Sequence, residues 1–132
     1  MTVDHLAIAV HRLSEAVPRW EQQLGAAASP PEEVPSQRVR AVFLDVDNTH
    51  LEFLEPTSED SPIARFLAQR GEGMHHIAFA VPSVDRKLAE LASAGVRLID
   101  TVSRPGARGR QVGFCHPSAF GGVLVEFVEA RP

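Results

Sequence analysis

The chain has 132 residues, a hydrophobic content of 44% and a formal net charge of −4, which suits one packed domain. The mild, evenly spread charge predicts no basic surface for nucleic acid or an anionic membrane. No apolar run approaches the roughly 18 residues of a transmembrane helix, no signal-peptide pattern is present, and the single cysteine, Cys115, cannot form an internal disulfide. We therefore expect a cytoplasmic protein with no nucleic-acid or membrane partner.

The first half of the chain predicts a strand, a helix and then further strands. Residues 3–10 alternate between large and small side chains, which is the period of a strand. Apolar residues then recur at helical spacing up to Leu24, where Ser14 can cap the helix and Gly25 can end it. Pro18 fits this helix only in its first turn. The remaining predictions are a loop over 26–37, with 26–29 as an alternative short strand, and strands over 39–46 and 50–55.

A short helical linker over residues 57–73 follows, and then the pattern restarts. Ser61 and Pro62 suit the N-cap and first residue of the linker helix, which Gly71 ends. The second half predicts a strand over 74–81, a helix from 84 to Gly95, an extended segment over 96–102, a loop over 106–109, and strands over 111–115 and 123–128. We therefore predict one α+β domain of two tandem βαβββ modules, about 1–56 and 74–132, paired into a curved mixed sheet around a metal site.

The two halves also repeat residues that can carry chemistry. The run DHLAIAV at 4–10 matches HHIAFAV at 75–81, and LEFLE at 51–55 matches VEFVE at 125–129. Each half thus has one histidine near its start and one glutamate near its end, and all four alternate away from the large apolar side chains. Any one of them alone is more often a structural histidine or a solvated glutamate. Repeated together, His5, Glu52, His76 and Glu126 predict a site for one divalent ion such as Zn, Mn, Co, Ni or Fe.

Other polar residues receive simpler interpretations. His75 should point away from the ion because it alternates with His76, and His116 suits a structural turn. Arg108 and Arg110 lie in a loop without phosphate-loop spacing, but either can meet an anionic ligand. The residues expected to be solvated are His11, His50, Glu55 and Glu129.

Several runs are similar to the motifs of one enzyme family. The runs at 4–10 and 51–56 resemble its DHxAIAV and ELLEP motifs, and the segment from His116 to Glu126 resembles HPK…GGVLIEL. The runs DSPIARFL at 60–67 and GEGMHHIA at 71–78 are the more specific matches. On these residues, nearly the whole chain resembles the methylmalonyl-CoA epimerases of the vicinal-oxygen-chelate (glyoxalase-like) superfamily.

The resemblance implies an isomerase that interconverts (2R)- and (2S)-methylmalonyl-CoA through an enolate. It implies paired βαβββ modules, a metal bound by His5, Glu52, His76 and Glu126, an acyl-CoA substrate and a homodimer. Epimerisation removes a proton on one face of the α-carbon and returns it on the other, so two acid/base groups are needed. The resemblance implies that Glu126 is one of them and that Glu52 is mainly a metal ligand.

The chain departs from the family at the second acid/base group. Some family members carry a glutamate on the strand over 39–46, and the matching residue here is Ala41, with no acid between Glu33 and Asp45. Glu52, Glu33 and a metal-bound water therefore remain alternatives for the second proton transfer.

Two other functions suit the same fold. A glyoxalase I-type isomerase would use a similar His/Glu set, whereas a ring-cleaving dioxygenase would not need the second acid at Glu52. A non-catalytic drug-binding protein would use aromatic stacking, but this chain has one Trp and no Tyr.

Overall fold

The computed structural model describes residues 1–131, which form two compact units. The first unit is His5–His75, and the second combines Met1–Asp4 with the chain from His76 onward. Each half of the chain contains a strand, a helix and three more strands, in that order. The predicted βαβββ repeat is therefore confirmed.

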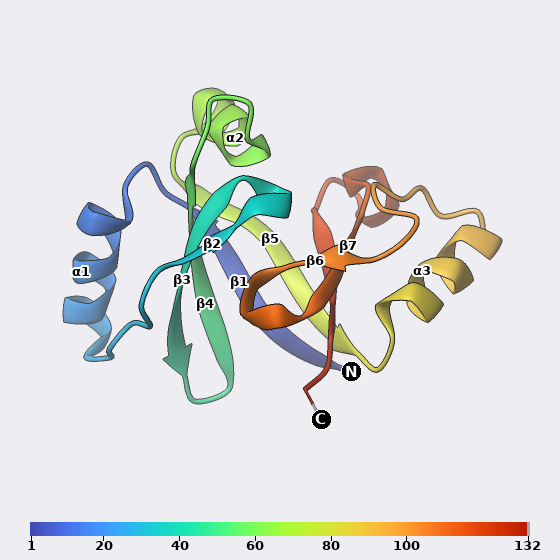
Figure 1. The fold of residues 1–132 in the computed structure, drawn as a ribbon, viewed down its shortest axis with the longest axis horizontal. Helices are drawn as coiled ribbons and strands as arrows, with labels where there is room; N and C mark the ends of the chain where they lie inside the picture. Colours follow the sequence, from blue (N-terminus) through green and yellow to red (C-terminus); the bar gives the residue numbers. More distant parts are fainter. Residues whose placement is uncertain (132) are drawn as a thin grey trace. The chain divides into compact units, whose positions relative to one another are not determined.

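The first unit contains a mixed sheet in the order β2-β3-β4-β1, in which β1 and β4 are parallel and the other pairs antiparallel. Figure 1 shows α1 beside the β3–β4 part of this sheet. The elements are β1 (Thr2–Ala9), whose first three residues belong to the second unit, α1 (Leu13–Leu24), β2 (Glu32–Val34), a 3₁₀ turn (Pro35–Gln37), β3 (Val39–Val46), β4 (Thr49–Pro56) and α2 (Pro62–Arg70).

The first helix, α1, begins without the cap that the sequence predicted. Its N-cap is Arg12, which gives no side-chain cap bond, and the Glu55 carboxylate on β4 accepts the Leu13 N–H at 3.0 Å instead. The helix ends as predicted at Gly25, which has a φ of 64°. Pro18 lies inside the helix, so α1 lacks one backbone hydrogen bond there.

The linker helix, α2, has the predicted ends. The Ser61 hydroxyl accepts the Ile63 N–H at 3.2 Å, and Gly71 is the C-cap. Just before it, a hydrogen bond from the Ser58 hydroxyl and the nearby Arg38 guanidinium lower the pKa of Asp60.

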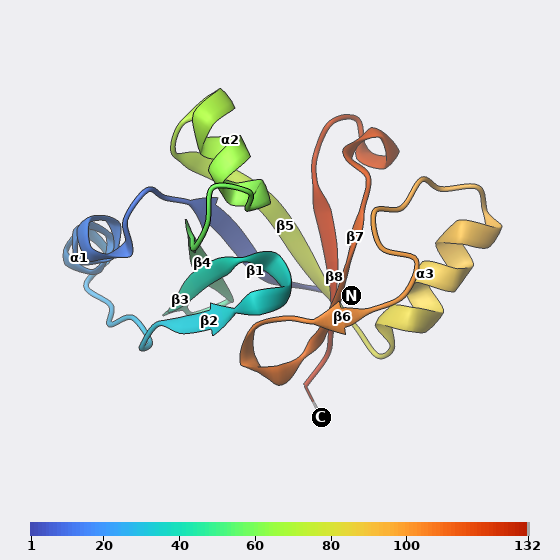
Figure 2. The ribbon, with the colours of Figure 1, turned by 45° about the horizontal axis from the view of Figure 1, so that its top comes forward.

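The second unit contains a mixed sheet in the order β5-β8-β7-β6, in which β5 and β8 are parallel. Figure 2 shows α3 alongside β7 and β8. The elements are β5 (Gly73–Val81), α3 (Val84–Ser93), β6 (Arg104–Pro105), a 3₁₀ turn (Ala107–Gly109), β7 (Gln111–Cys115), a second 3₁₀ turn (Pro117–Phe120) and β8 (Val125–Glu129).

The extra strand of each module is displaced from its predicted position. Residues 26–29 and 96–102 form only isolated bridges, Ala28 to Leu44 and Leu98 to Cys115, and the strands are β2 and β6 further along. In the first module Pro30 and Pro31 interrupt the segment, because proline cannot donate to a sheet ladder. In the second, the Asp100 carboxylate takes the Phe114 N–H, so side-chain bonding replaces the ladder there.

Each unit packs its helix on one face of its sheet, as the alternation predicted. In the first unit the helix face carries Ile8, Val10, Val42, Leu44 and Phe53. In the second it includes Val81, Cys115, Val125 and Phe127. Burial raises the pKa of the Cys115 thiol. Within the described residues, the helices are all too short or too polar to pass through a bilayer.

Candidate metal centre

The first unit brings His5 and Glu52 together on the sheet face opposite α1. Strands β1 and β4 run parallel with Ala7 beside Glu52, and His5 lies two residues before Ala7 on the same face. The His5 Nε2 atom is 3.3 Å from the Glu52 Oε1 atom. Both residues are buried, with exposed fractions of 3% and 6%. The sequence prediction that these residues pair is therefore confirmed within this unit.

The second unit repeats the arrangement with His76 and Glu126. Ala78 on β5 lies beside Glu126 on β8, and His76 precedes Ala78 by two residues. The His76 Nε2 atom is 3.5 Å from the Glu126 Oε1 atom, and the exposed fractions are 3% and 2%. The two halves thus place an imidazole and a carboxylate in the same register.

A phenylalanine completes each pair, and neither one was predicted from the sequence. Phe43 on β3 lies directly opposite Glu52, and Phe114 on β7 lies directly opposite Glu126. Phe43 meets the His5 ring at 6.1 Å between centroids and 88° between planes, and Phe114 meets His76 at 5.1 Å and 87°. Perpendicular aromatic contacts restrict ring orientation, so both imidazoles are held by a ring as well as by their strands. Phe43 and Phe114 stand at different distances in sequence from their glutamates, so only the strand pairing reveals that they match.

The segment before each outer strand is fixed to the same phenylalanine. In the first unit, the Ser29 N–H donates to the Phe43 carbonyl at 2.8 Å, and the Phe43 N–H donates to the Ser29 hydroxyl at 2.9 Å. In the second, the Asp100 N–H donates to the Phe114 carbonyl at 3.1 Å, and the Phe114 N–H donates to the Asp100 carboxylate at 2.9 Å. These bonds connect the segment before β2 to β3 and the segment before β6 to β7.

The outer strands then present residues of opposite charge. Glu32 on β2 lies directly opposite Ala41, and Arg104 on β6 lies directly opposite Val112. The Arg104 Nε atom is 3.3 Å from an Asp100 carboxylate oxygen, and its guanidinium carbon lies 5.5 Å from the Phe114 ring centroid. That distance is typical of a cation–π contact. The Phe114 ring therefore contacts both Arg104 and His76.

Three histidines outside the two His–Glu pairs make contacts of their own. His116 accepts the Ser118 N–H at 3.1 Å and starts a 3₁₀ turn, so its structural role is confirmed. His75 packs against Phe66 with 5.0 Å between ring centroids. His50 pairs with Asp45 at 2.5 Å, and 35% of its side chain is exposed.

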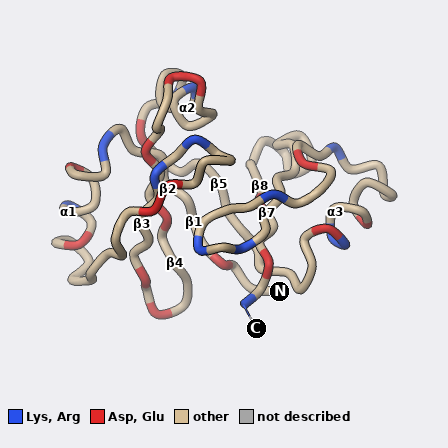
Figure 3. The backbone as a smooth tube through the Cα atoms, viewed as in Figure 1, with Lys and Arg blue, Asp and Glu red and all other residues tan. Residues whose placement is uncertain are grey.

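Glu55 and Arg110 make contacts that the sequence did not predict. Glu55 was predicted to be solvated, but it is half-buried, caps α1 and pairs with Arg40 at 3.2 Å. Figure 3 shows basic residues along the segment between β6 and β7. Among them, Arg110 makes two hydrogen bonds to Asp4, at 2.7 and 2.8 Å. Arg110 therefore has a structural partner, in place of the anionic ligand that the loop suggested.

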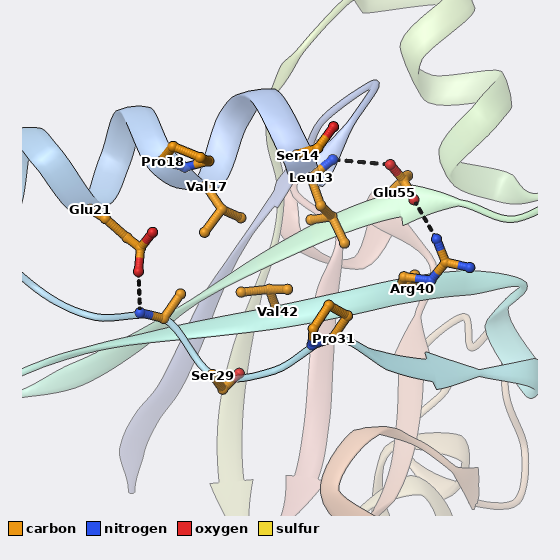
Figure 4. Close-up of a pocket in the computed structure, with 11 residues that line it drawn as sticks. Leu13, Ser14, Val17, Pro18, Glu21, Ser29, Pro31, Arg40, Val42 and Glu55 are labelled. Carbon is orange, nitrogen blue, oxygen red and sulfur yellow. Dashed lines mark hydrogen bonds and ion pairs between the residues drawn. The ribbon is translucent and has the colours of Figure 1, made fainter.

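A cavity of about 460 Å³ lies between α1 and β3 of the first unit. Its walls include Val17, Val42 and Pro31, and Figure 4 shows Glu55 joining Leu13 and Arg40 beside it. Val42 belongs to the helix face of the sheet. Alternation puts Phe43 and Glu52 on the other face. The cavity is thus separate from the His5–Glu52 pair.

The chain is similar to known proteins over almost all of its length. Residues 4–114 match the model of the glyoxalase/bleomycin resistance protein/dioxygenase superfamily. The mitochondrial methylmalonyl-CoA epimerase of Bos taurus is 37% identical over 97% of this chain and 74% of its own. A crystal structure of methylmalonyl-CoA epimerase from Mycobacterium tuberculosis matches with a TM-score of 0.93 and 34% identity, over 99% of this chain and 89% of its own.

A Streptomyces coelicolor methylmalonyl-CoA epimerase variant was solved in complex with 2-nitronate-propionyl-CoA. It matches with a TM-score of 0.92 and 36% identity, over 98% of this chain and 94% of the other.

Proposed function

Since the chain belongs to the glyoxalase/bleomycin resistance protein/dioxygenase superfamily, we propose that it is an isomerase that epimerises (2R)- and (2S)-methylmalonyl-CoA. The observation that carries the proposal is the matched, buried His–Glu pair in each unit of a chain that aligns with methylmalonyl-CoA epimerases over nearly all of its own length. Cytoplasmic location and a homodimeric state are part of the same proposal.

The donor set suits a divalent ion. Two neutral imidazoles and two carboxylates form the mixed N/O set that Zn, Mn, Co, Ni or Fe accept. Glu52 and Glu126 are almost completely buried, and a buried carboxylate needs a nearby positive charge or strong hydrogen bonds. We propose that His5, Glu52, His76 and Glu126 hold one such ion, which when bound supplies Lewis-acid stabilisation of an enolate.

The protein's own residues account for orientation and proton transfer. Phe43 and Phe114 fix the two imidazoles, and parallel strand pairing fixes the two carboxylates. Glu126 accepts the α-proton on one face of the substrate carbon, or returns it there. A positioned acid/base group typically contributes about 10²–10⁴-fold in rate.

The test is proton exchange with solvent. The protein loaded with Co²⁺ or Mn²⁺ is incubated in deuterated water with (2S)-methylmalonyl-CoA, and both epimers are followed by NMR. We expect deuterium at C2 and the formation of the (2R) epimer, at a rate well above a protein-free sample. Treatment with a chelator should abolish both, and added metal should restore them.

A paired assay separates this function from its rival. The same preparation is offered the methylglyoxal–glutathione adduct, the substrate of a glyoxalase I-type enzyme. Turnover of that adduct without turnover of methylmalonyl-CoA would overturn the proposal.

A further inference from the structure

The strand that carries a glutamate in some relatives presents an alanine here. Ala41 lies on β3 and is 1% exposed. It shares a face with Phe43, which lies opposite Glu52. An alanine cannot move a proton, so the second transfer needs another group.

The neighbouring strand β2 supplies a carboxylate at that place. Glu32 lies directly opposite Ala41 in the antiparallel β2–β3 pair, and directly opposed residues project from the same face of a sheet. Glu32 is partly buried. The acid missing from β3 is therefore present one strand further out.

The adjacent glutamate points the other way. Glu33 lies opposite Arg40, and its carboxylate accepts a hydrogen bond from the Arg40 guanidinium at 3.1 Å. Arg40 also binds Glu55 on the side of the sheet that faces α1. Glu33, one of the alternatives open at the sequence level, is thus turned away from the face that carries Glu52.

The strand register sets the separation between Glu32 and Glu52. Glu32 on β2 pairs with Ala41 on β3, and Ala41 pairs with Leu54 on β4. Because Leu54 follows Glu52 by two residues, Glu32 lies two strands across the sheet from Glu52 and two residues further along. With strands about 4.8 Å apart and a rise of about 3.4 Å per residue, their Cα atoms are about 12 Å apart on one face.

We propose that Glu32 is the second acid/base residue of this enzyme, an inference that rests on the function proposed above. In one direction the Glu32 carboxylate takes the α-proton, and the electrons of the broken C–H bond delocalise onto the thioester oxygen. Protonated Glu126 then donates its proton to the opposite face of the same carbon, and the enolate electrons form the new C–H bond. Glu32 ends protonated and Glu126 ionised, so the reverse reaction or proton exchange with water restores the starting state.

The test uses the two epimers separately, because each presents its α-proton to a different glutamate. Glu32→Gln, loaded with metal, is mixed with (2R)- or (2S)-methylmalonyl-CoA in deuterated water. We expect epimerisation to fall by about 10²–10⁴-fold, while one epimer still exchanges its C2 proton without inversion. Glu126→Gln should retain exchange of the other epimer only.

Glu33→Gln is the matched control, since it makes the same chemical change one residue away on the opposite face. It should keep exchange and epimerisation within about twofold of wild type. Metal content and the urea midpoint are measured for all variants, and Glu32→Gln should match wild type in both.

The outcomes separate this inference from the proposed function. If wild type fails to epimerise, the proposed function fails. If wild type is active and Glu32→Gln epimerises normally, or loses exchange of both epimers equally, Glu32 is not the second acid/base residue.

Discussion

The two units share a His–Phe–Glu arrangement and differ one strand further out. In the first, Glu32 lies beside Ala41; in the second, Arg104 lies beside Val112. The inner positions keep the same residue types, histidine and glutamate, in both copies. The outer positions carry opposite charges. The two copies therefore keep the same inner His–Glu pair while their outer strands carry different charges.

The helices differ as well. In the first unit, Val42 lines the cavity under α1. Gly113 holds the equivalent place beside Phe114, and a Cβ atom there would lie 2.8 Å from a methyl group of Leu88 on α3. Helix α3 therefore packs closely on its sheet, whereas α1 leaves a cavity beside its sheet.

The largest effect should separate Glu52 from Glu126, the two glutamates proposed as metal ligands. We expect Glu126→Gln to lower kcat by about 10²–10⁴-fold, because it removes a proton acceptor. Glu52→Gln keeps a ligating oxygen and should retain substantial turnover. Measuring kcat for both at saturating metal checks this. If Glu52→Gln is inactive and Glu126→Gln is active, Glu52 is the acid/base residue and Glu126 mainly a ligand.

The charge on β6 should affect binding more than chemistry. Asp100 and Phe114 hold the Arg104 guanidinium where it can meet an anionic group of an acyl-CoA. A hydrogen bond to a charged group contributes about 1.5–3 kcal/mol, so Arg104→Gln should raise KM by about tenfold or more. Arg86→Gln, on α3, removes the same charge elsewhere and should leave KM unchanged. A fall in kcat at constant KM would contradict a binding role.

The difference in helix packing predicts that added bulk costs more stability under α3 than under α1. Gly113→Ala pushes against Leu88 and should lower the free energy of unfolding by about 1–3 kcal/mol. Val42→Ile adds a methylene beside a cavity and should cost less than about 1 kcal/mol. Urea denaturation of both variants compares them. Equal losses would mean that α1 and α3 are packed equally tightly.

The smallest effect concerns the glutamates that follow the ligands by three residues. Glu55 caps α1, whereas α3 is capped by the Ser83 hydroxyl and Glu129 is exposed. Glu55→Ala should cost about 0.5–2 kcal/mol, as loss of an N-cap usually does. Glu129→Ala should stay within about 0.5 kcal/mol. Thermal unfolding of the two variants measures both effects. Equal shifts in Tm would mean that Glu55 does not stabilise α1 as a cap.

The sequence predicted what depends on local patterns. Alternation placed His5 and His76 on the correct strand faces, the repeat paired each with its glutamate, and Ser61 was recognised as a cap. The resemblance to methylmalonyl-CoA epimerases is confirmed by the relatives and solved structures. Binding of one ion by all four ligands remains a prediction.

The errors come from long-range pairing. Glu32 lay in a segment predicted as loop, where no face can be assigned until β2 is aligned with β3. The cap from Glu55 joins residues 42 positions apart, and no local propensity encodes such a bond. The matched phenylalanines required knowing which residues lie opposite the glutamates.

The ion pair between Asp4 and Arg110 has a consequence for folding order. Its partners are 106 residues apart in sequence, and Asp4 belongs to the unit that the C-terminal half completes. During synthesis this contact can therefore form only after nearly the whole chain has been made. Loop-closure entropy grows slowly with length, so the delay costs little stability, but it raises contact order and slows folding. A single cut between the halves would separate Asp4 from its own unit, which makes this duplication poorly divisible despite its internal symmetry.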